Sequence, residues 1–459
     1  MQMPDRQKGI GIDLTEGSIL KTLLIYAFPL LLTNLVQQLY GAVDLMVIGH
    51  FGGAEGTVGV SNGAEMPELL TFIGTSFAGA GQIYVAQLAG MKDNEKIKDA
   101  VGTLVTLLLG VAIVLMVFSF VFCVPFLNML NTPGEAMSES YNYMMIASLG
   151  IPFVFGYNAV CAILRGMGNS RRPLMFVIIA ATANIFMDLL MVVIFKLGAG
   201  GTAIATVIAQ FASFVAAAVY LYRRREHIGI EFNLKSFRIK KEPLRVIVRL
   251  GVPMTLHAFF IHISQLYCKS HINAYGLVAS ATNSVGNKIN RFANIIMNGF
   301  TQGAGAVIGQ NIGARKHDRV KKTVYTALTL AYSMCAVNCV LALTVPRMFF
   351  LIFTNTPEVI ELGVEFMKIS VCTFILSAWM GPFGGVVSGS GNARLSFIAG
   401  LLDGVVLRIS ISLVLAYTFD MGIIGFFWGD SLARLAPGIL NSVYFFSGRW
   451  RTRKLLTES

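Results

Sequence analysis

Apolar stretches of about 20 residues or more alternate with short polar segments along the whole chain. Crossing the hydrocarbon core of a bilayer as a helix takes about 20 residues at 1.5 Å each, so this pattern predicts an all-α polytopic membrane protein. Twelve transmembrane helices are predicted, at residues 20–48, 56–89, 99–123, 139–163, 173–196, 200–222, 244–274, 280–312, 321–345, 360–388, 394–418 and 422–446.

Composition agrees with this reading: 55% of the 459 residues are hydrophobic, 13% are charged and the mean hydropathy is +0.67. The net charge of +12 would also suit nucleic acid, but 28 of the 36 Lys and Arg lie at the two ends, in the even-numbered loops or near the adjoining helix ends. Cytoplasmic segments of membrane proteins carry such an excess. We therefore expect no nucleic-acid partner, and a multi-pass protein of the cytoplasmic (inner) cell membrane with both termini in the cytoplasm.

A few polar side chains interrupt the apolar helices. Asn184 and Asp188 are four residues apart in the fifth predicted helix, so they share one helical face. Asp44 and Thr206 lie in the first and sixth helices, and counting the helix rise places Asp44, Thr206 and Asp188 about 6, 9 and 12 Å from the outer helix ends. An acid in the bilayer is costly and is functional by default. These oxygens suit Na⁺, and equally a proton, because two desolvated carboxylates repel one another.

The first helix also carries a polar stripe. Asn34, Gln37, Gln38 and Asp44 recur at spacings that keep them on one side of an otherwise apolar helix, with Tyr40 nearby. Such a stripe faces water or protein and not lipid. We therefore take Asn34, Gln37, Gln38 and Tyr40 as candidate substrate contacts.

Cofactor and metal chemistry find little support in the sequence. The six cysteines lie in predicted helices without metal-ligand spacing, and there is no G-x-x-x-x-G-K-[ST] nucleotide loop. We expect no cofactor, no catalytic residues and no metal beyond a possible Na⁺, so any energy that the protein uses must come from an ion gradient or from a partner chain.

The chain contains an internal repeat at a separation of 223 to 224 residues. "VAQLAGMKDNEKIKDAV" from Val85 parallels "IGQNIGARKHDRVKKTV" from Ile308, "NTP" recurs, and "RGMGN" parallels "SGSGN". Two halves of six helices insert the same way up, which is a transporter arrangement. We predict an N-terminal lobe at 1–222, a cytoplasmic linker at 223–243 and a C-terminal lobe at 244–459. One chain holds both halves, so we expect a functional monomer.

Several motifs together resemble the multidrug and toxic compound extrusion (MATE) family: "QQLYGAVDLMVIGHFGG", "VAQLAG", "LRGMGNSRRP", "NIFMD", "ATVIAQ" and "GQNIGA". The resemblance implies two six-helix bundles forming a V-shaped cleft, and export of organic cations and drugs in exchange for Na⁺ or H⁺ by alternating access. The family's cation site falls on Asp44, Asn184, Asp188 and Thr206, the set that the residues themselves had indicated.

The second half departs from the first. At offset 223 the counterparts of Asp44, Asn184 and Asp188 are Tyr267, Leu407 and Ile411, so a second cation site is not predicted. Arg408 lies near mid-membrane and would favour anionic substrates if it faced the cleft, although Asp403 is close in sequence. Asp430 and Arg434 are expected to pair locally, because they are spaced i, i+4.

Opposite charges occupy equivalent positions of the repeat. Glu65 and Glu68 correspond to Lys288 and Arg291 at offset 223. One hypothesis is a gate in which these pairs meet when the outer side is closed; the equal alternative is that each group reaches the membrane interface or pairs within its own lobe.

Two other function classes stay open at this point. A flippase for a lipid-linked anionic substrate would use the basic residues of the second half. An intramembrane aspartyl enzyme would use two membrane aspartates as a dyad, but the chain lacks a G-x-G-D motif.

Overall fold

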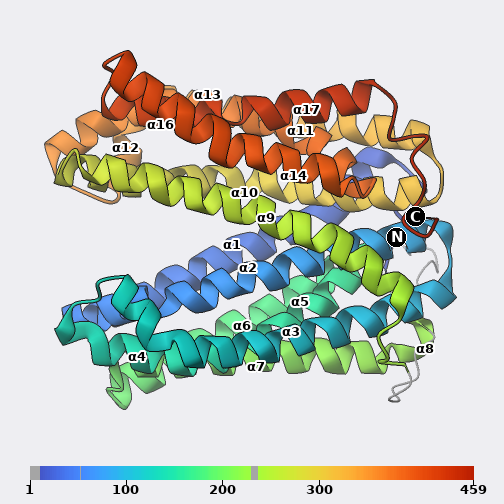
Figure 1. Cartoon of the computed structure of the whole chain (residues 1–459), viewed down its shortest axis with the longest axis horizontal. Coiled ribbons are helices and arrows are strands. Elements are labelled where there is room, and N and C mark those ends of the chain that lie inside the picture. The colour runs from blue at the N-terminus through green and yellow to red at the C-terminus, as the bar shows by residue number, and fades with distance from the viewer. Residues whose placement is uncertain (1–10, 52, 229–235, 459) are drawn as a thin grey trace, which may run out of the picture. The chain divides into compact units, whose positions relative to one another are not determined.

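The computed structural model describes residues 11–51, 53–228 and 236–458, and this part of the chain is helical and without strands. Figure 1 shows the helices as long rods joined by short turns. The elements of the first half are α1 (Ile19–Phe51), α2 (Gly53–Met91), α3 (Asn94–Met129), α4 (Gly134–Ser148), α5 (Ile151–Gly166), α6 (Arg171–Asp188), the π-helix η1 (Leu189–Ile194), α7 (Gly198–Arg223) and α8 (Arg225–Ile228).

The second half repeats this order with more interruptions. Its elements are α9 (Lys241–Asn273), α10 (Leu277–Gly313), α11 (His317–Thr344), α12 (Pro346–Leu351), α13 (Pro357–Gly389), α14 (Ala393–Leu401), the π-helix η2 (Leu402–Arg408), α15 (Ile409–Leu413), the π-helix η3 (Val414–Thr418), α16 (Ile423–Leu432) and α17 (Leu435–Phe446).

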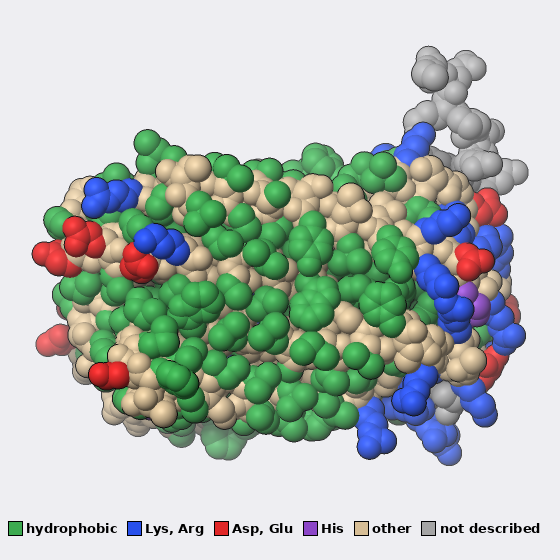
Figure 2. All heavy atoms as spheres, turned by 90° about the horizontal axis from the view of Figure 1, so that it is seen from above, with side chains coloured by type: hydrophobic (Ala, Val, Ile, Leu, Met, Phe, Trp, Pro, Cys, Tyr) green, Lys and Arg blue, Asp and Glu red, His purple; other side chains and the backbone are tan. Residues whose placement is uncertain are grey.

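The predicted membrane spans correspond to these helices. Nine described helices are long and apolar enough to cross a membrane, and α4 and α5, bent by 43° at their junction, form one more span. The helices α10 and α13 are also long enough, at 37 and 33 residues, which brings the number to the twelve expected. Figure 2 shows hydrophobic side chains covering a broad band, with Lys and Arg gathered at one end. The all-α polytopic class is therefore confirmed.

The described chain divides into two compact units. The first comprises Met1–Asp13 and Leu32–Gly251, and the second comprises Leu14–Leu31 and Val252–Ser459. The helix α1 contributes to both, because its first part packs with the second unit and the remainder with the first. No pattern in the sequence indicates this division of α1, and the predicted lobe boundaries at 222 and 244 remain a proposal.

Small residues and one carboxylate set the packing of the first unit around α6 and α7. A Cβ on Gly201 of α7 would lie 3.1 Å from the Met191 carbonyl oxygen of η1, so a larger residue would push the two elements apart by a few tenths of an ångström. The first turn of α7 is held by Glu139 of α4, whose Oε2 accepts the Ala199 N–H at 2.7 Å. These contacts fix the height of α7 beside the end of α6.

The described part of the linker also belongs to the first unit. Its residue Phe237 accepts a hydrogen bond from the Thr106 hydroxyl at 2.6 Å, and the N–H of Lys240 donates to Thr103 Oγ1 at 3.0 Å. The linker therefore runs along α3 before α9 begins.

In the second unit, the segment before α1 is gripped by side chains of α10 and α11. Leu14 N–H donates to Gln310 Oε1 at 3.1 Å, and Asn311 Nδ2 donates to the Leu14 carbonyl oxygen at 3.1 Å. Arg319 Nη1 donates to the Gly17 carbonyl oxygen at 2.9 Å, and its Nε donates to Asn311 Oδ1 at 3.1 Å. Asn311 is fully buried and joins both sets of contacts.

Replacing Asn311 by alanine is expected to destabilise the protein by about 1–3 kcal/mol, because it leaves the buried Leu14 carbonyl and part of the Arg319 guanidinium without a partner. Thermal unfolding of the purified protein in detergent measures the loss, and limited proteolysis at residues 14–17 should accelerate. Asn294→Ala on the same helix is the matched control, because Asn294 bonds only to the Asn290 carbonyl oxygen of its own helix. Equal effects of both variants would contradict this account of the N-terminal segment.

Candidate functional site

The first unit brings together the four residues that the sequence singled out. Asp44 lies on the part of α1 that belongs to this unit, Asn184 and Asp188 lie in the last turns of α6, and Thr206 lies in the third turn of α7. Asp188 is the last α-helical residue before the π-helix η1 begins. A π-helical stretch inside a span is uncommon and is frequently found at functional sites.

Asn184 and Asp188 are buried, Asp44 and Thr206 are half-buried, and all four carry buried polar atoms that are poorly satisfied. Asn184 is 1% exposed and Asp188 is 0% exposed. Among the described residues, no hydrogen-bond partner is found for Asp44 Oδ1, both carboxylate oxygens of Asp188, both amide atoms of Asn184, or Thr206 Oγ1. Buried polar atoms are nearly always hydrogen bonded in folded proteins, so this concentration in one place needs an explanation.

The side chains face one another. Asp44 lies close enough to Asp188 and Asn184 for side-chain interaction, and Thr206 interacts in the same way with Tyr143 of α4. A hydrogen bond between the two carboxylates requires a proton on one of them. Tyr143 is 7% exposed and also feels the charges of Asp44 and Asp188. Nothing in the sequence distinguished Tyr143 from the other tyrosines of the chain, because its proximity depends on how α4 packs on α7.

The chemistry of this cluster is limited to oxygen ligands and proton exchange. Two carboxylates, an amide oxygen and a hydroxyl are hard donors of the kind that Na⁺ takes, and a carboxylate pair also exchanges a single proton. No three His, Cys, Asp or Glu side chains gather into a transition-metal cluster anywhere in the described ranges. The six cysteines are free thiols.

Comparisons with known proteins identify the family of the chain. The MatE family model matches residues 29–190 and 253–418, which together make up most of the chain. The chain therefore belongs to the MATE family of efflux transporters. Multi-pass membrane insertion and transport follow from this membership, which removes the intramembrane-enzyme hypothesis.

Curated relatives of this MATE protein span its whole length. A probable multidrug resistance protein of Bacillus subtilis, YoeA, is 25% identical over 96% of each chain. The multidrug export protein MepA of Staphylococcus aureus is 22% identical over 95% of each chain. A solved structure described as the outward-facing conformation of a multidrug resistance MATE family transporter shares the fold, with a TM-score of 0.90 at 18% identity over 98% of this chain and 99% of the other.

The polar stripe of this MATE transporter lies on α1 in the first unit. The Gln37 side chain is exposed, whereas Asn34, Gln38 and Tyr40 are partly covered. Tyr40 lies within electrostatic range of Asp44 and of Glu68. The stripe therefore adjoins the four-residue cluster, and its role in substrate contact remains a prediction.

The gate candidates are exposed in both units. Glu65 and Glu68 lie on α2 of the first unit, and Lys288 and Arg291 lie on α10 of the second. Their exposure fits either a gate or interfacial charges, so the gate stays a prediction.

Arg408 corrects an expectation drawn from the sequence. Its side chain is 2% exposed inside the second unit, where Nη2 donates to Asp403 Oδ1 at 2.9 Å and Nη1 donates to Asp430 Oδ1. It therefore does not present a charge to a substrate-facing surface. The predicted local pair is confirmed, because Arg434 Nη1 donates to Asp430 Oδ2 at 3.2 Å.

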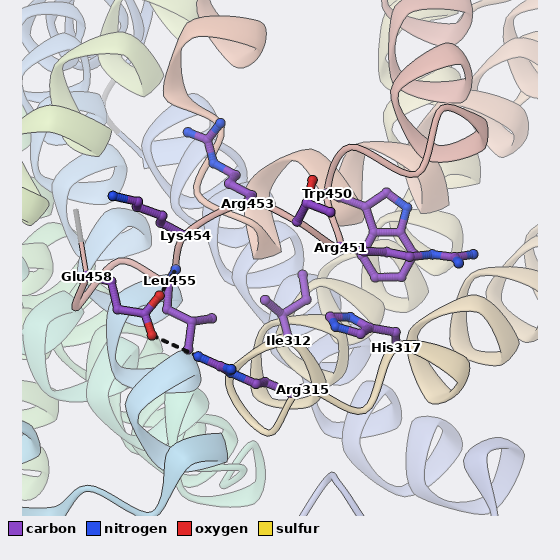
Figure 3. A pocket seen from close by; sticks show the side chains of 10 residues that line it. Ile312, Arg315, His317, Trp450, Arg451, Arg453, Lys454, Leu455 and Glu458 are labelled. Carbon is purple, nitrogen blue, oxygen red and sulfur yellow. Dashed lines mark hydrogen bonds and ion pairs between the residues drawn. The ribbon is translucent and has the colours of Figure 1, made fainter.

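A separate pocket of about 200 Å³ lies where the C-terminal segment meets α10 and α11. Figure 3 shows that its basic side chains point in different directions, with Arg453 and Lys454 directed away from Arg451. Its Arg315 pairs with Glu458 at 2.9 Å, and the Trp450 indole donates to the Phe445 carbonyl oxygen at 3.0 Å. None of the predicted site residues lines this pocket, and its contacts serve to attach the C-terminal segment.

Two membrane aspartates should respond oppositely to the same substitution. Asp430→Asn removes one acid from a network with the buried Arg408 and with Arg434. Because the Asp430 side chain is 32% exposed, the cost should lie below the range of about 3–5 kcal/mol for a fully buried pair. Asp188→Asn removes a carboxylate that faces another carboxylate, so it should keep or raise stability. Thermal unfolding of each purified variant in detergent without Na⁺ measures the difference. A lower midpoint for Asp188→Asn than for Asp430→Asn would show that the cluster in the first unit is already satisfied.

Proposed function

We propose that this chain is a secondary antiporter that exports organic cations and drugs in exchange for Na⁺ or H⁺, and that Asp44, Asn184, Asp188 and Thr206 bind the coupling cation. The observation that carries the proposal is the set of buried oxygens without partners that these residues direct toward one another. Oxygen atoms arranged in this way are satisfied by a cation or a proton and by little else.

Electrostatics support this assignment. Two carboxylates at the same place in a low-dielectric interior repel one another, and removing a charge from water is costly without a compensating partner. No Lys or Arg is found in an ion pair with either Asp44 or Asp188 among the described residues. A monovalent cation or a proton supplies the compensation that the protein does not.

Coupling follows from linkage between two ligands. If the coupling cation and the substrate favour different packings of α1, α6 and α7, then each lowers the affinity of the protein for the other by the same factor. Cation entry from outside then releases the drug outward, and drug binding from inside displaces the cation.

The substrate class rests on the relatives and on the polar stripe. The relatives are named for multidrug resistance and export. The amide side chains of α1 beside Tyr40, together with the Phe and Met of the chain, suit varied aromatic cations, because flexible and aromatic side chains adapt to different shapes. No cofactor enters this scheme, and one chain suffices as the functional unit.

The flippase alternative has less support. It depended on basic residues of the second half, and two of them, Arg408 and Arg434, are held by Asp403 and Asp430 inside that unit. Lys288 and Arg291 are exposed and remain available to an anionic substrate.

The proposed orientation places both termini in the cytoplasm of a cell whose inner membrane holds the protein. Lys and Arg crowd the end of the molecule beyond the apolar band in Figure 2, as expected for a cytoplasmic face.

Reconstitution in proteoliposomes tests the function. Efflux of a fluorescent organic cation is measured with a Na⁺ gradient and a pH gradient imposed separately. We expect one of the gradients to drive transport in the wild type, and Asp188→Asn to abolish gradient-driven transport, because it removes a carboxylate from the cluster.

Asp420→Asn is the matched control, since Asp420 is exposed in the turn before α16 and asparagine also tolerates its positive φ of 54°. This control should transport normally. Transport driven by neither gradient in the wild type, with flipping of an anionic lipid precursor in its place, would reverse the ranking of the two functions.

A further inference from the structure

The second unit contains a group of four charges that is neutral as a whole, with Arg408 and Asp403 buried and Asp430 and Arg434 partly exposed. Arg408 donates to Asp403 and to Asp430, and Asp430 also accepts from Arg434. Arg408 is 2% exposed and Asp403 is 4% exposed. Buried ion pairs of this kind contribute little net stability compared with apolar residues, so their presence invites a functional reason.

The repeat changes register at this cluster. Asn169 before α6 and Asn392 before α14 make the same contact with the backbone three residues on, accepting from Arg172 N at 3.2 Å and from Leu395 N at 3.3 Å, and they are 223 residues apart. The turns that end these spans hold Lys196 and Asp420, both with a φ of 54°, and these are 224 residues apart. The second unit therefore contains one additional residue between the cap and the turn.

The extra residue is absorbed by a π-helix. The span in the first unit has one π-helical stretch, η1, immediately before its turn, and η3 occupies the same place in the second unit. The second unit has a further stretch, η2 (Leu402–Arg408), within the span. A π-helical turn holds about one residue more than an α-helical turn, so the register moves from 223 to 224 across η2.

This shift corrects the correspondence expected from the sequence. From the last residue of η2 onward the offset is 224, and the counterparts of Asn184 and Asp188 are Arg408 and Ser412, not Leu407 and Ile411. The remaining two counterparts also follow an offset of 224. Pro29 of α1 matches Pro253 of α9, which makes Cys268 the counterpart of Asp44. Gly198 of α7 matches Gly422 before α16, which makes Asp430 the counterpart of Thr206.

The contacts within each unit agree with the corrected register. In the first unit Asp44 interacts with Asp188, and in the second their counterparts meet, with Cys268 Sγ donating to Ser412 Oγ at 3.8 Å. Cys268 also lies within electrostatic range of Arg408 and Asp430. The four counterparts therefore form one cluster in the second unit, as the four original residues do in the first.

We propose that the guanidinium of Arg408 takes the place that a coupling cation would occupy in the first unit, so that the second unit carries a permanent, covalently attached cation and binds no exchangeable one. The carboxylate that receives it comes from Asp430, at the position where the first unit has the hydroxyl of Thr206. Asp403, at the start of η2, corresponds to Ala180 at the offset of 223 and supplies the second carboxylate. Each chain then couples transport through one cation site.

The charges of the cluster define the test. Asp403, Arg408, Asp430 and Arg434 sum to zero, so removing the Arg408 guanidinium leaves one uncompensated negative charge in a buried place. The cluster should then take up one monovalent cation, Na⁺ or H⁺, from solution. The statement that each chain couples transport through one cation site rests on the proposed function. The uptake of a cation after loss of the Arg408 guanidinium does not, so measuring this uptake tests the inference separately.

The experiment uses the full chain in detergent with Asp188→Asn, which disables the first unit. Binding of ²²Na⁺ is measured by equilibrium dialysis, and proton uptake is measured by titration in the same preparations. We expect Arg408→Gln to bind one more cation per chain than the Asp188→Asn parent. Arg408→Lys keeps a cation in place and should bind none beyond the parent. Adding Asp430→Asn to Arg408→Gln restores neutrality and should also abolish the extra binding.

Two results would overturn the proposal. One is a folded Arg408→Gln variant that takes up neither Na⁺ nor a proton. The other is an Asp188→Asn parent that still binds a cation and loses it with Asp430→Asn, because the second unit would then hold an exchangeable site of its own. If the wild type and Asp188→Asn bind cations equally, the proposed function fails. The comparison of Arg408→Gln with its Asp188→Asn parent still tests the role of the guanidinium.

A reciprocal substitution keeps the test decisive if Arg408→Gln does not fold. Asn184→Arg places a guanidinium beside Asp44 and Asp188, as Arg408 lies beside its acids in the second unit. Cation affinity at the first unit should fall by about tenfold or more relative to Asn184→Met, a neutral residue of similar length. Equal affinity in the two variants would contradict the equivalence of guanidinium and bound cation.

Discussion

The cost of placing charge inside a membrane protein governs this structure. A carboxylate removed from water needs a hydrogen-bond donor, a basic partner, a proton or a metal ion. The two units meet this requirement differently. In the second, Arg408 and Arg434 neutralise Asp403 and Asp430 through direct ion pairs, whereas in the first Asp44 and Asp188 face each other with oxygens that no described side chain satisfies.

Duplication makes this difference meaningful. The same helices, in the same order and with matching turns, build both clusters, so the two units are two chemical versions of one arrangement. If the second unit is neutral without a ligand and the first unit needs a cation from solution, then the first unit is the half that responds to the coupling cation. The second would then be a stable partner whose charge state does not vary during transport.

Irregular helix geometry is what allows the two versions to differ. The π-helix η2 adds one residue to a span without breaking it, and one residue turns an α-helix by about 100°. A side chain that would otherwise face elsewhere is thereby directed into the cluster. A second such feature is α1, one continuous helix that is divided between the units; the segment before it is held in the second unit by Gln310, Asn311 and Arg319.

Much of the fold and of the candidate site was predictable, because both depend on local patterns. The length of each apolar run sets each span. A polar or acidic residue within such a run is recognisable whatever surrounds it, and this is why the sequence alone indicates Asp44, Asn184, Asp188 and Thr206. The involvement of Tyr143, the enclosure of Arg408 and the true counterparts in the second unit were not predictable. Each depends on the rotation of one helix against another, and a single inserted residue changes that rotation while leaving the hydrophobic pattern almost unaltered.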